Sequence, residues 1–422
     1  MSMTAQLRTD GSLAEAFQQV RDCTESLAAP LSAEDQQVQS MPDVSPTKWH
    51  RAHVTWFFET FVLKPFLDDY VTLDERYNYL YNSYYEAVGA RHPRAERGMV
   101  TRPTADQVTS YRRFVDESMA RLFSRGLHER PEVAELVVLG LHHEQQHQEL
   151  LLMDAKHVLS LNHFDPAYRP SSPKASMSAP SLGWVDHPGG LAMVGALGEG
   201  FSFDNEGPRH EALIQPHRLC DRLVTCGEWL DFMADDGYHR AELWLSAGWH
   251  HSRAEGWDAP MYWSVGDDGW QVHTLNGVVP VDPNEPVVHV SYYEADAFAR
   301  WAGYRLPTEF EWEVHAAAQE VAGNLLPAQE LHPRAAESGP GLKQVFGDVW
   351  EWTASSYSPY PRFRPAEGAV GEYNGKFMVD QQVLRGGACV TPGGHIRATY
   401  RNFFPASSRW MFGGLRLADD RI

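Results

Sequence analysis

Residues 141–150 read LHHEQQHQEL and place His143 and His147 four positions apart, in a segment whose apolar residues recur at helical spacing. On a helix, positions i and i+4 lie on one face about 6 Å apart, so the two imidazoles can bind one metal ion. Paired histidines on a helix can instead face water or bond a backbone carbonyl. His142 competes as a ligand, but it is five positions from His147 and lies on a diverging face.

A third ligand is expected from another apolar, aromatic segment, whose residues 48–57 read KWHRAHVTWF. Trp49, His53 and Trp56 form one stripe of this helix, which predicts that His53 points inward and His50 toward the edge. Either histidine could also simply pack in a Trp-rich core. Three imidazoles would leave coordination positions open for a substrate or for oxygen.

Three neighbours of the histidine pair are candidates for supporting roles. Gln146 can hydrogen-bond a bound molecule. Glu144 and Glu149 can orient the ligand imidazoles through hydrogen bonds.

Helical spacing extends through the first 160 residues. We expect helices over 13–27, 48–66, 108–122 and 132–159, and a four-helix bundle is the simplest arrangement of them. Such bundles commonly hold metals between facing helices. We therefore assign residues 1–168 to a metal-binding bundle and the stretch 169–182, with its Pro- and Ser-rich run, to a linker.

Beyond residue 183 the pattern changes to short apolar runs separated by Gly, Pro, Asp and Asn. This pattern predicts a loop-rich α+β domain over 183–422, with two embedded helices over 225–236 and 292–303. The expected fold class is therefore an α domain followed by an α+β domain. A Trp-rich insert spans 237–286.

Composition limits the classes of function. The chain has 422 residues, too many for one ordinary core, and 43% of them are hydrophobic. A net charge of −20 argues against nucleic acid as a partner, because binding to phosphates depends on Lys and Arg. No apolar run is long enough for a membrane span, the first residues lack a secretory signal, and the four cysteines form no CxxC pair. We expect a soluble cytoplasmic protein with reduced thiols.

Two further motifs could bind or protonate a ligand. Tyr84 and Tyr85 offer phenols that can donate a proton, although tyrosine clusters usually serve packing. Arg91, Arg94 and Arg97 recur every three residues and can bind carboxylates through two parallel hydrogen bonds, or can form a solvated basic loop.

Near the C-terminus, Asn402, Phe403 and Phe404 combine an amide with two aromatic rings. Aromatic faces can hold an alkylated ammonium, although the same residues are ordinary in a core. Cys389 follows a glycine pair, and a lone cysteine of this kind is most often a small buried hydrophobic residue.

Together these segments resemble the iron-dependent sulfoxide synthases of ergothioneine biosynthesis over nearly the whole chain. The N-terminal part looks like their DinB-type bundle. Five motifs look like their formylglycine-generating-enzyme-type domain, which has a C-type-lectin-like fold: GPRH at 207–210, VTCGE at 224–228, RLPTE at 305–309, GDVWEW at 347–352 and LRGG at 384–387. The order and spacing of these matches carry the resemblance.

The resemblance implies a role for each candidate residue. The ligands of an Fe(2+) cofactor would be His53, His143 and His147, and Gln146 would position the substrate imidazole. The trimethylammonium group of hercynine would be held by Asn402, Phe403 and Phe404. Tyr84 and Tyr85 resemble the paired tyrosines of the branch that uses free cysteine. Arg94 and Arg97 resemble the arginines that bind the carboxylate in that branch.

The implied reaction joins a thiol, with cysteine as first choice, to the imidazole carbon of hercynine with O2 and gives a sulfoxide. Ala388 and the run PGGH at 392–395 depart from the pattern of the mainstream family, so a selenosugar donor, as in selenoneine synthesis, is the alternative. A non-catalytic lectin-like binding module and a formylglycine-generating enzyme are two further readings, and the second needs two suitably placed thiols. Oligomeric state, cysteine versus gamma-glutamylcysteine, and the identity of the proton-donating phenol are left open.

Overall fold

The computed structural model describes residues 12–170, 177–327, 330–367, 371 and 374–421. The chain divides into two units. The first comprises Met1–Tyr168 with the segments Leu197–Ser202 and Pro365–Tyr373, and the second comprises Arg169–Ala196, Phe203–Arg364 and Asn374–Ile422. Part of the expected linker, residues 171–176, lies outside the described residues. The domain limits expected at 168 and 183 therefore stay predictions.

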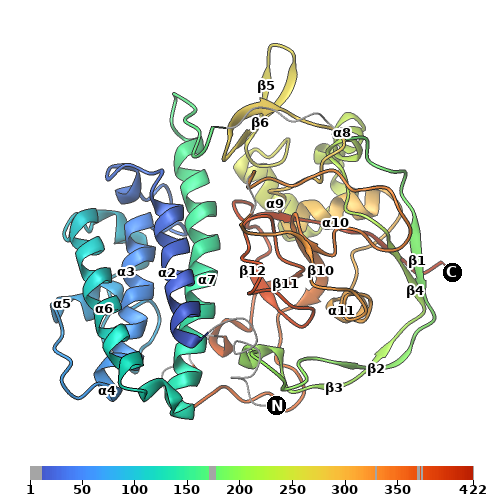
Figure 1. Cartoon of the computed structure of the whole chain (residues 1–422). Helices are drawn as coiled ribbons and strands as arrows, with labels where there is room; N and C mark the ends of the chain where they lie inside the picture. Colours follow the sequence, from blue (N-terminus) through green and yellow to red (C-terminus); the bar gives the residue numbers. More distant parts are fainter. Residues whose placement is uncertain (1–11, 171–176, 328–329, 368–370, 372–373, 422) are drawn as a thin grey trace. The chain divides into compact units, whose positions relative to one another are not determined.

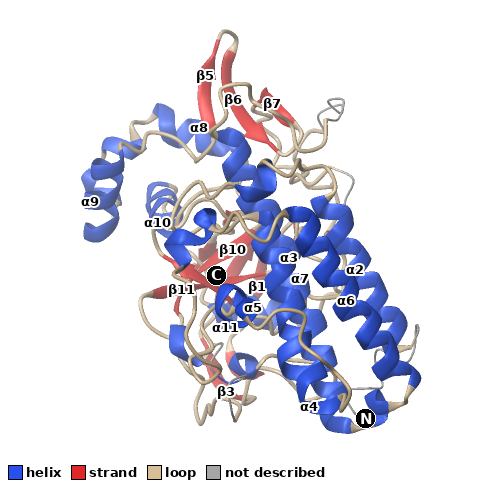
Figure 2. Cartoon of the chain, turned by 90° about the vertical axis from the view of Figure 1, so that its left-hand side faces the viewer, coloured by secondary structure: helices blue, strands red, loops and turns tan. Residues whose placement is uncertain are grey.

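The first unit contains the four long helices that the sequence predicts. They are α2 (Leu13–Ala28), α3 (Thr47–Phe58), α6 (Ala105–Ser124) and α7 (Pro131–Ser160), which lie side by side in Figures 1 and 2. Local signals start them: Ser12 and Thr104 begin α2 and α6 with reciprocal side-chain to backbone caps, and Pro131 occupies the first turn of α7.

Helix α3 lies in the middle of this unit. Every one of its residues is buried, so it has no solvent-exposed face. The helix expected over 48–66 is not continuous α-helix: α3 changes into a π-helix over Glu59–Leu63 and ends in the short α4 (Lys64–Phe66). A π-helical segment in an otherwise regular helix is rare and often lies near a functional site. The described residues of this unit also include the short α-helix α5 (Arg76–Tyr81) and a 3-10 helix over Arg94–Met99.

The second unit is built on small sheets. A four-stranded sheet has the order β12 (Asn402–Pro405), β11 (Gln381–Arg385), β10 (Trp350–Ser356) and β13 (Gly413–Gly414). A three-stranded sheet has the order β1 (Trp184–His187), β4 (His217–Cys220) and β14 (Ala418–Asp419). Strand β14 therefore pairs the end of the described chain with a strand 200 positions earlier.

Three smaller sheets complete the strand pairing in the described part of this unit. They are β2 (Gly190–Val194) with β3 (His210–Ile214), β5 (Trp263–Gly266) with β6 (Gly269–Thr274) and β7 (Gly277–Pro280), and β8 (Gly323–Asn324) with β9 (Phe346–Gly347).

The second unit has more helix than the sequence predicts. The two expected helices are present as α8 (Cys226–Ala234) and α10 (Tyr292–Trp301), and Ser291 caps the second as its motif predicts. Two more, α9 (Ser246–Glu255) and α11 (Glu309–Ala316), correct the prediction of only two. Helix α9 begins without a side-chain cap, whereas Thr308 and Glu311 form a capping box at α11 that was a signal available in the sequence. The expected class, an α part followed by an α+β part, is confirmed.

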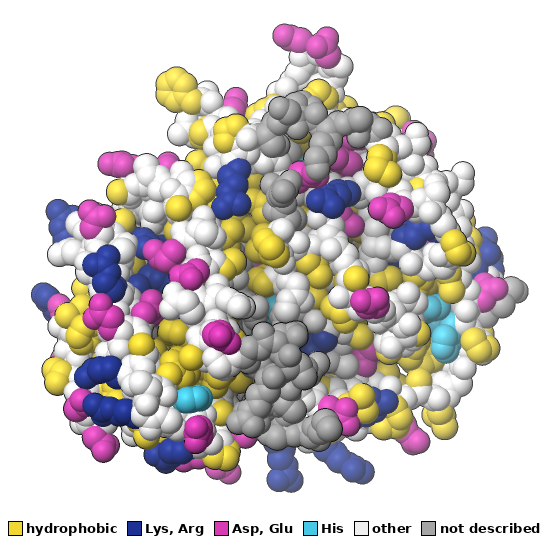
Figure 3. All heavy atoms as spheres, viewed as in Figure 1, with side chains coloured by type: hydrophobic (Ala, Val, Ile, Leu, Met, Phe, Trp, Pro, Cys, Tyr) yellow, Lys and Arg dark blue, Asp and Glu magenta, His cyan; other side chains and the backbone are white. Residues whose placement is uncertain are grey.

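Charged side chains of both signs are interspersed on the face drawn in Figure 3, where no continuous stripe of Lys and Arg appears. In the described ranges, no helix combines the length and the apolar character that a bilayer crossing requires.

Candidate metal centre

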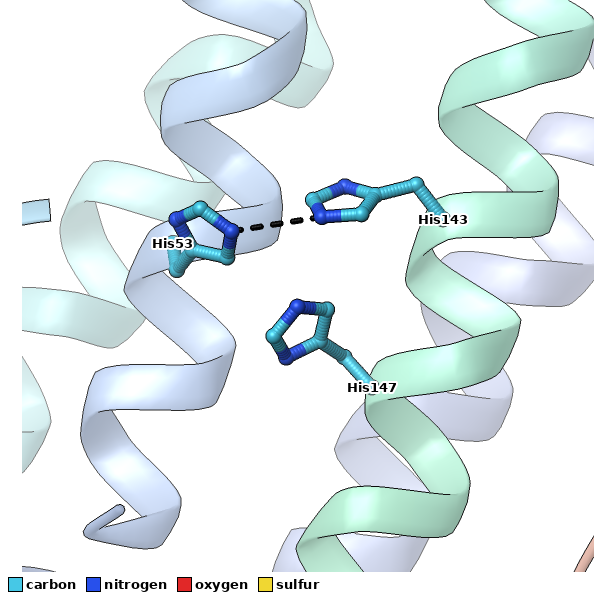
Figure 4. A group of neighbouring side chains, drawn as sticks. All are labelled: His53, His143 and His147. Atoms are coloured by element: carbon cyan, nitrogen blue, oxygen red, sulfur yellow. Dashed lines mark hydrogen bonds between the residues drawn. The ribbon is translucent and has the colours of Figure 1, made fainter. Parts of the chain in front are cut away.

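Three imidazoles meet between α3 and α7. His53 comes from α3, and His143 and His147 come from successive turns of α7 and point toward it (Figure 4). One nitrogen from each ring lies within 4.8 Å of the others, and the Nε2 atoms of His53 and His143 are 3.2 Å apart. Imidazole nitrogens bind metal ions at about 2.1 Å, so two of them on one ion are at most about 4.2 Å apart. The His53–His143 pair already has such a spacing, and the widest pair has to close only slightly to share an ion with it.

His53 is held with one nitrogen directed to the centre. Its Nδ1–H donates to the carbonyl oxygen of Tyr81 at 2.6 Å, which leaves the Nε2 lone pair available. The ring stacks on Trp49 with a centroid distance of 4.6 Å and on Trp56 with 5.6 Å. The aromatic stripe predicted from sequence therefore positions this imidazole.

Burial keeps the three rings neutral. It lowers the pKa of His143 to about 4, and it lowers the pKa of His53 and of His147 well below the ordinary value, with neighbouring imidazoles adding to the effect for these two. Neutral imidazole is the form that binds metals, so the cluster is ready to bind without first losing protons at neutral pH.

The stripe in the sequence predicts that His50 points toward the edge, but in the structure this residue is buried. It is 3% exposed, and its Nδ1 lies 2.8 Å from Nδ1 of His147. The prediction is wrong because α3 is surrounded on all sides, so its aromatic stripe does not mark a single inward face. A second histidine three positions before His53 was the signal available in the sequence.

The sequence analysis expects Glu144 to orient an imidazole of the cluster, but in the structure its carboxylate binds other side chains. Its two carboxylate oxygens accept from Arg21 at 2.8 Å, from Thr24 at 2.7 Å and from Arg112 at 3.0 Å. Its neighbour in sequence, His143, belongs to the imidazole cluster, but one helix position rotates the side chain by about 100°, which directs Glu144 to the guanidinium groups of other helices. The orienting role expected for Glu149 stays a prediction.

His142 and Gln146 flank the cluster on α7. The ring of His142 stacks on Phe201 with a centroid distance of 3.9 Å, which accounts for its position without metal binding. Gln146 is half-buried, three positions after His143 and one before His147.

The tyrosine pair lies in the same unit. The hydroxyl groups of Tyr84 and Tyr85 are 3.4 Å apart. Tyr85 is buried against Trp56 and Phe61, with ring centroids 5.7 and 5.2 Å away, whereas Tyr84 is half-buried. The first of these two contacts is with the tryptophan that stacks on His53.

The three arginines differ in their surroundings. Arg97 is buried, lies 3.4 Å over the ring of Trp49, and donates to the hydroxyl groups of Ser45 at 2.9 Å and Ser83 at 3.0 Å. Burial and the nearby Arg94 lower its pKa to about 9. No carboxylate among the described side chains is within ion-pair distance of Arg97, so it is suited to an anionic ligand.

The other two arginines are exposed and already engaged. Arg94 donates to the carbonyl oxygen of Asp43, and Arg91 forms an ion pair with Glu86 at 2.9 Å. The regular three-residue spacing therefore does not give three equivalent side chains.

The residues expected to hold an ammonium group lie on β12, at the edge of the four-stranded sheet of the second unit. Phe403 stacks on Tyr357 at a centroid distance of 4.1 Å, and Phe404 meets Trp410 edge to face at 5.6 Å. Successive strand residues point to opposite sides of a sheet. Asn402 therefore shares a face with Phe404, and Phe403 lies on the other face.

The cysteines of the second unit are buried. Burial raises the pKa of Cys220 to about 11 and raises the pKa of Cys226 well above the ordinary value, and Cys389 is fully buried. Protonated thiols are poor nucleophiles, so the first two have no sign of redox or nucleophilic activation.

Comparisons with known families place both parts of the chain. The model of the DinB superfamily matches residues 16–151. The model of the sulfatase-modifying factor enzyme 1-like domain matches residues 171–337 and 325–421.

Curated relatives extend the comparison over both matches. The hercynine oxygenase of Mycolicibacterium thermoresistibile is 30% identical over 418 residues, 90% of this chain and 88% of that protein. That of Mycolicibacterium smegmatis is 34% identical over 314 residues, 67% of this chain and 71% of that protein. The formylglycine-generating enzyme of Streptomyces coelicolor is 30% identical over 265 residues, 53% of this chain and 81% of that protein.

Proposed function

Because the chain belongs to the hercynine oxygenase family, we propose that it joins the sulfur of free cysteine to the imidazole carbon of hercynine with O2, giving a sulfoxide. It is an oxidoreductase that forms a carbon–sulfur bond. The observation that carries the proposal is the convergence of His53, His143 and His147, three imidazoles that could together hold a metal ion.

Ferrous iron is the metal that we assign to this centre. Held by three neutral imidazoles, it would supply redox chemistry with O2 and lower the pKa of a coordinating thiol. The buried, neutral state of the rings supports the assignment, because no proton has to leave them before the metal binds.

The donor carboxylate is assigned to Arg97. Its buried guanidinium has neutral hydroxyl partners, and a substrate carboxylate would supply the missing negative charge. Its contact with Trp49, which stacks on His53, supports a donor position near the metal ligands. In this proposal Arg94 contributes less to binding of the donor carboxylate, because its charge is exposed to solvent.

We assign the role of proton donor to the tyrosine pair. Tyr84 and Tyr85 are within reach of one another, so one phenol can donate a proton to the reacting oxygen while the other hydrogen-bonds to it. Positioning of the two substrates is the main contribution of the remaining residues.

In the first unit, Gln146 is assigned to a substrate imidazole. Within the second unit, Asn402, Phe403 and Phe404 of β12 are assigned to a trimethylammonium group. On that strand, Asn402 and Phe404 share one face and can act together, and Phe403 supports the opposite face through its stack on Tyr357.

A selenosugar is the alternative donor, because residues 388–395 depart from the sequence pattern of the mainstream family. Such a donor lacks the amino acid carboxylate that Arg97 is proposed to bind. The two donors therefore predict different consequences of changing this arginine.

One experiment tests the reaction and separates the donors. Protein purified without oxygen and loaded with ferrous iron is mixed with hercynine and with cysteine, gamma-glutamylcysteine or the selenosugar in separate arms, and O2 consumption and product mass are measured. We expect the sulfoxide of the cysteine adduct, and none from the His143→Ala variant. Product formed only in the selenosugar arm would show that the selenosugar, and not cysteine, is the donor. Absence of both bound iron and O2 consumption in every arm would favour a non-catalytic binding module.

A further inference from the structure

The ligand imidazole of His147 is supported from behind by a second imidazole. Nδ1 of His147 lies 2.8 Å from Nδ1 of His50, and Nε2 of His50 lies 3.0 Å from Oδ2 of Asp154. The same carboxylate oxygen accepts from the backbone N–H of Ser45 at 2.8 Å. His50 and Asp154 are 3% and 4% exposed, so water competes little for these bonds.

The partners determine where the hydrogens lie. The carboxylate of Asp154 only accepts, so Nε2 of His50 donates to it. In a neutral imidazole the other nitrogen is then an acceptor, and Nδ1 of His50 accepts from Nδ1–H of His147. This leaves the lone pair of His147 on Nε2, the nitrogen that is free to bind a metal.

We propose that Asp154 and His50 form a positioning relay that fixes the tautomer and the ring orientation of His147 for metal binding. The proposal rests on the proposed function, because it presupposes a metal between His53, His143 and His147. His53 receives the equivalent support directly from the carbonyl oxygen of Tyr81. His53 from α3 and His147 from α7 are thus each oriented by an acceptor at Nδ1.

The relay explains why a fourth histidine, His50, lies beside the cluster without joining it. Its two ring nitrogens are already taken by Asp154 and His147. A hydrogen bond from a metal-bound imidazole to such an acceptor raises the basicity of the ligand, and loss of the acceptor typically weakens metal affinity about 10–100-fold.

The test compares substitutions of His50 that keep or remove the acceptor. His50→Phe fills the volume without an acceptor, whereas His50→Asn places an amide oxygen near the position of Nδ1. Cobalt(II) is titrated into the metal-free full-length protein and followed by calorimetry and by visible absorption. We expect His50→Phe to bind cobalt about 10–100-fold more weakly with an altered absorption band, and His50→Asn to retain more of the affinity.

A matched control and a stability measurement separate positioning from folding. His142→Phe makes the same change on α7 beside a ligand, outside the relay, and should keep the affinity of the original protein. Thermal unfolding of the metal-free variants shows whether each one folds. If His50→Phe fails to fold, Asp154→Asn takes its place, with weaker cobalt binding again the expected result.

The outcomes distinguish the two proposals. Equal cobalt affinity and identical absorption in the original protein and in a folded His50→Phe or Asp154→Asn variant would overturn the relay and leave the metal site in place. Failure of the original protein to bind cobalt or iron would overturn the metal site itself.

Discussion

Arg97 shows how one side chain is prepared for an anionic ligand. Its guanidinium lies over the ring of Trp49, and two serine hydroxyls fix its orientation. Burial lowers its pKa to about 9, so it is still charged at pH 7. A buried positive charge with only neutral partners costs free energy, and a ligand carboxylate would offset that cost on binding.

Substitution of this residue tests its role. Arg97→Lys keeps the charge but loses the paired hydrogen bonds, and it should lower kcat/KM for cysteine about 10- to 100-fold, or about 1.5–3 kcal/mol. Arg94→Lys, at an exposed position, should change it little. The measurement is steady-state kinetics with cysteine varied at saturating hercynine, with thermal unfolding as a check on folding. Equal effects of the two substitutions would contradict the assignment.

At the scale of elements, the distance between α3 and α7 depends on Gly140. A Cβ atom at this position would lie 2.6 Å from Cε1 of Phe58 and 2.9 Å from Cε1 of Phe57. The glycine lies within one turn of His143, on the helix that must approach α3 for the imidazoles to meet. A glycine in mid-helix normally destabilises, so its presence here is explained by close packing.

A single methyl group should therefore disturb the metal centre. Gly140→Ala would gain about 1 kcal/mol from helix propensity alone, but overpacking should reverse the sign and cost about 1–3 kcal/mol of the free energy of unfolding. Iron affinity should fall because the helices separate. Urea unfolding and iron titration measure both effects, and the double variant Gly140→Ala/Phe58→Leu should recover part of each. A stabilised Gly140→Ala variant with unchanged iron affinity would show that this contact is not limiting.

At the scale of the whole molecule, buried histidines connect stability with pH. In the second unit, Nε2 of His315 lies 3.2 Å from Nε2 of His217, and the ring of His187 is close to both. Glu311 and Arg416 also act on this ring electrostatically. Burial, with the neighbouring imidazoles, lowers the pKa of His315 to about 4.

The sign of the pH effect follows from this shift. Above pH 6.5 the ring is neutral in the folded and unfolded chains, so its full contribution to stability is present. Between 6.5 and about 4 only the unfolded chain binds the proton, so the free energy of unfolding falls as the pH falls, by at most about 3 kcal/mol. His315→Gln should flatten this part of the curve, as measured by urea unfolding of iron-free protein. His163→Gln, at an exposed position, should keep the original slope. If the free energy of unfolding had the same pH dependence in both variants, the lowered pKa of His315 would be contradicted.

The local pattern of the sequence was sufficient for the four long helices of the first unit and for the choice of His53, His143 and His147 as ligand candidates. It did not reveal the π-helical segment Glu59–Leu63 or the short helix α5. Helical periodicity and capping depend on residues within one or two turns, and both are visible in the chain itself. The order of five short motifs was likewise sufficient to recognise the family.

Tertiary structure decided which neighbours these residues meet. It placed His50 against His147, turned Glu144 to Arg21 and Arg112, and buried Arg97 while leaving Arg94 exposed. These outcomes depend on helices that are far apart in sequence and on α3 being enclosed on every side, which no local spacing encodes. The sequence by itself determined which side chains can carry the chemistry, and packing between distant elements determined which partners orient them.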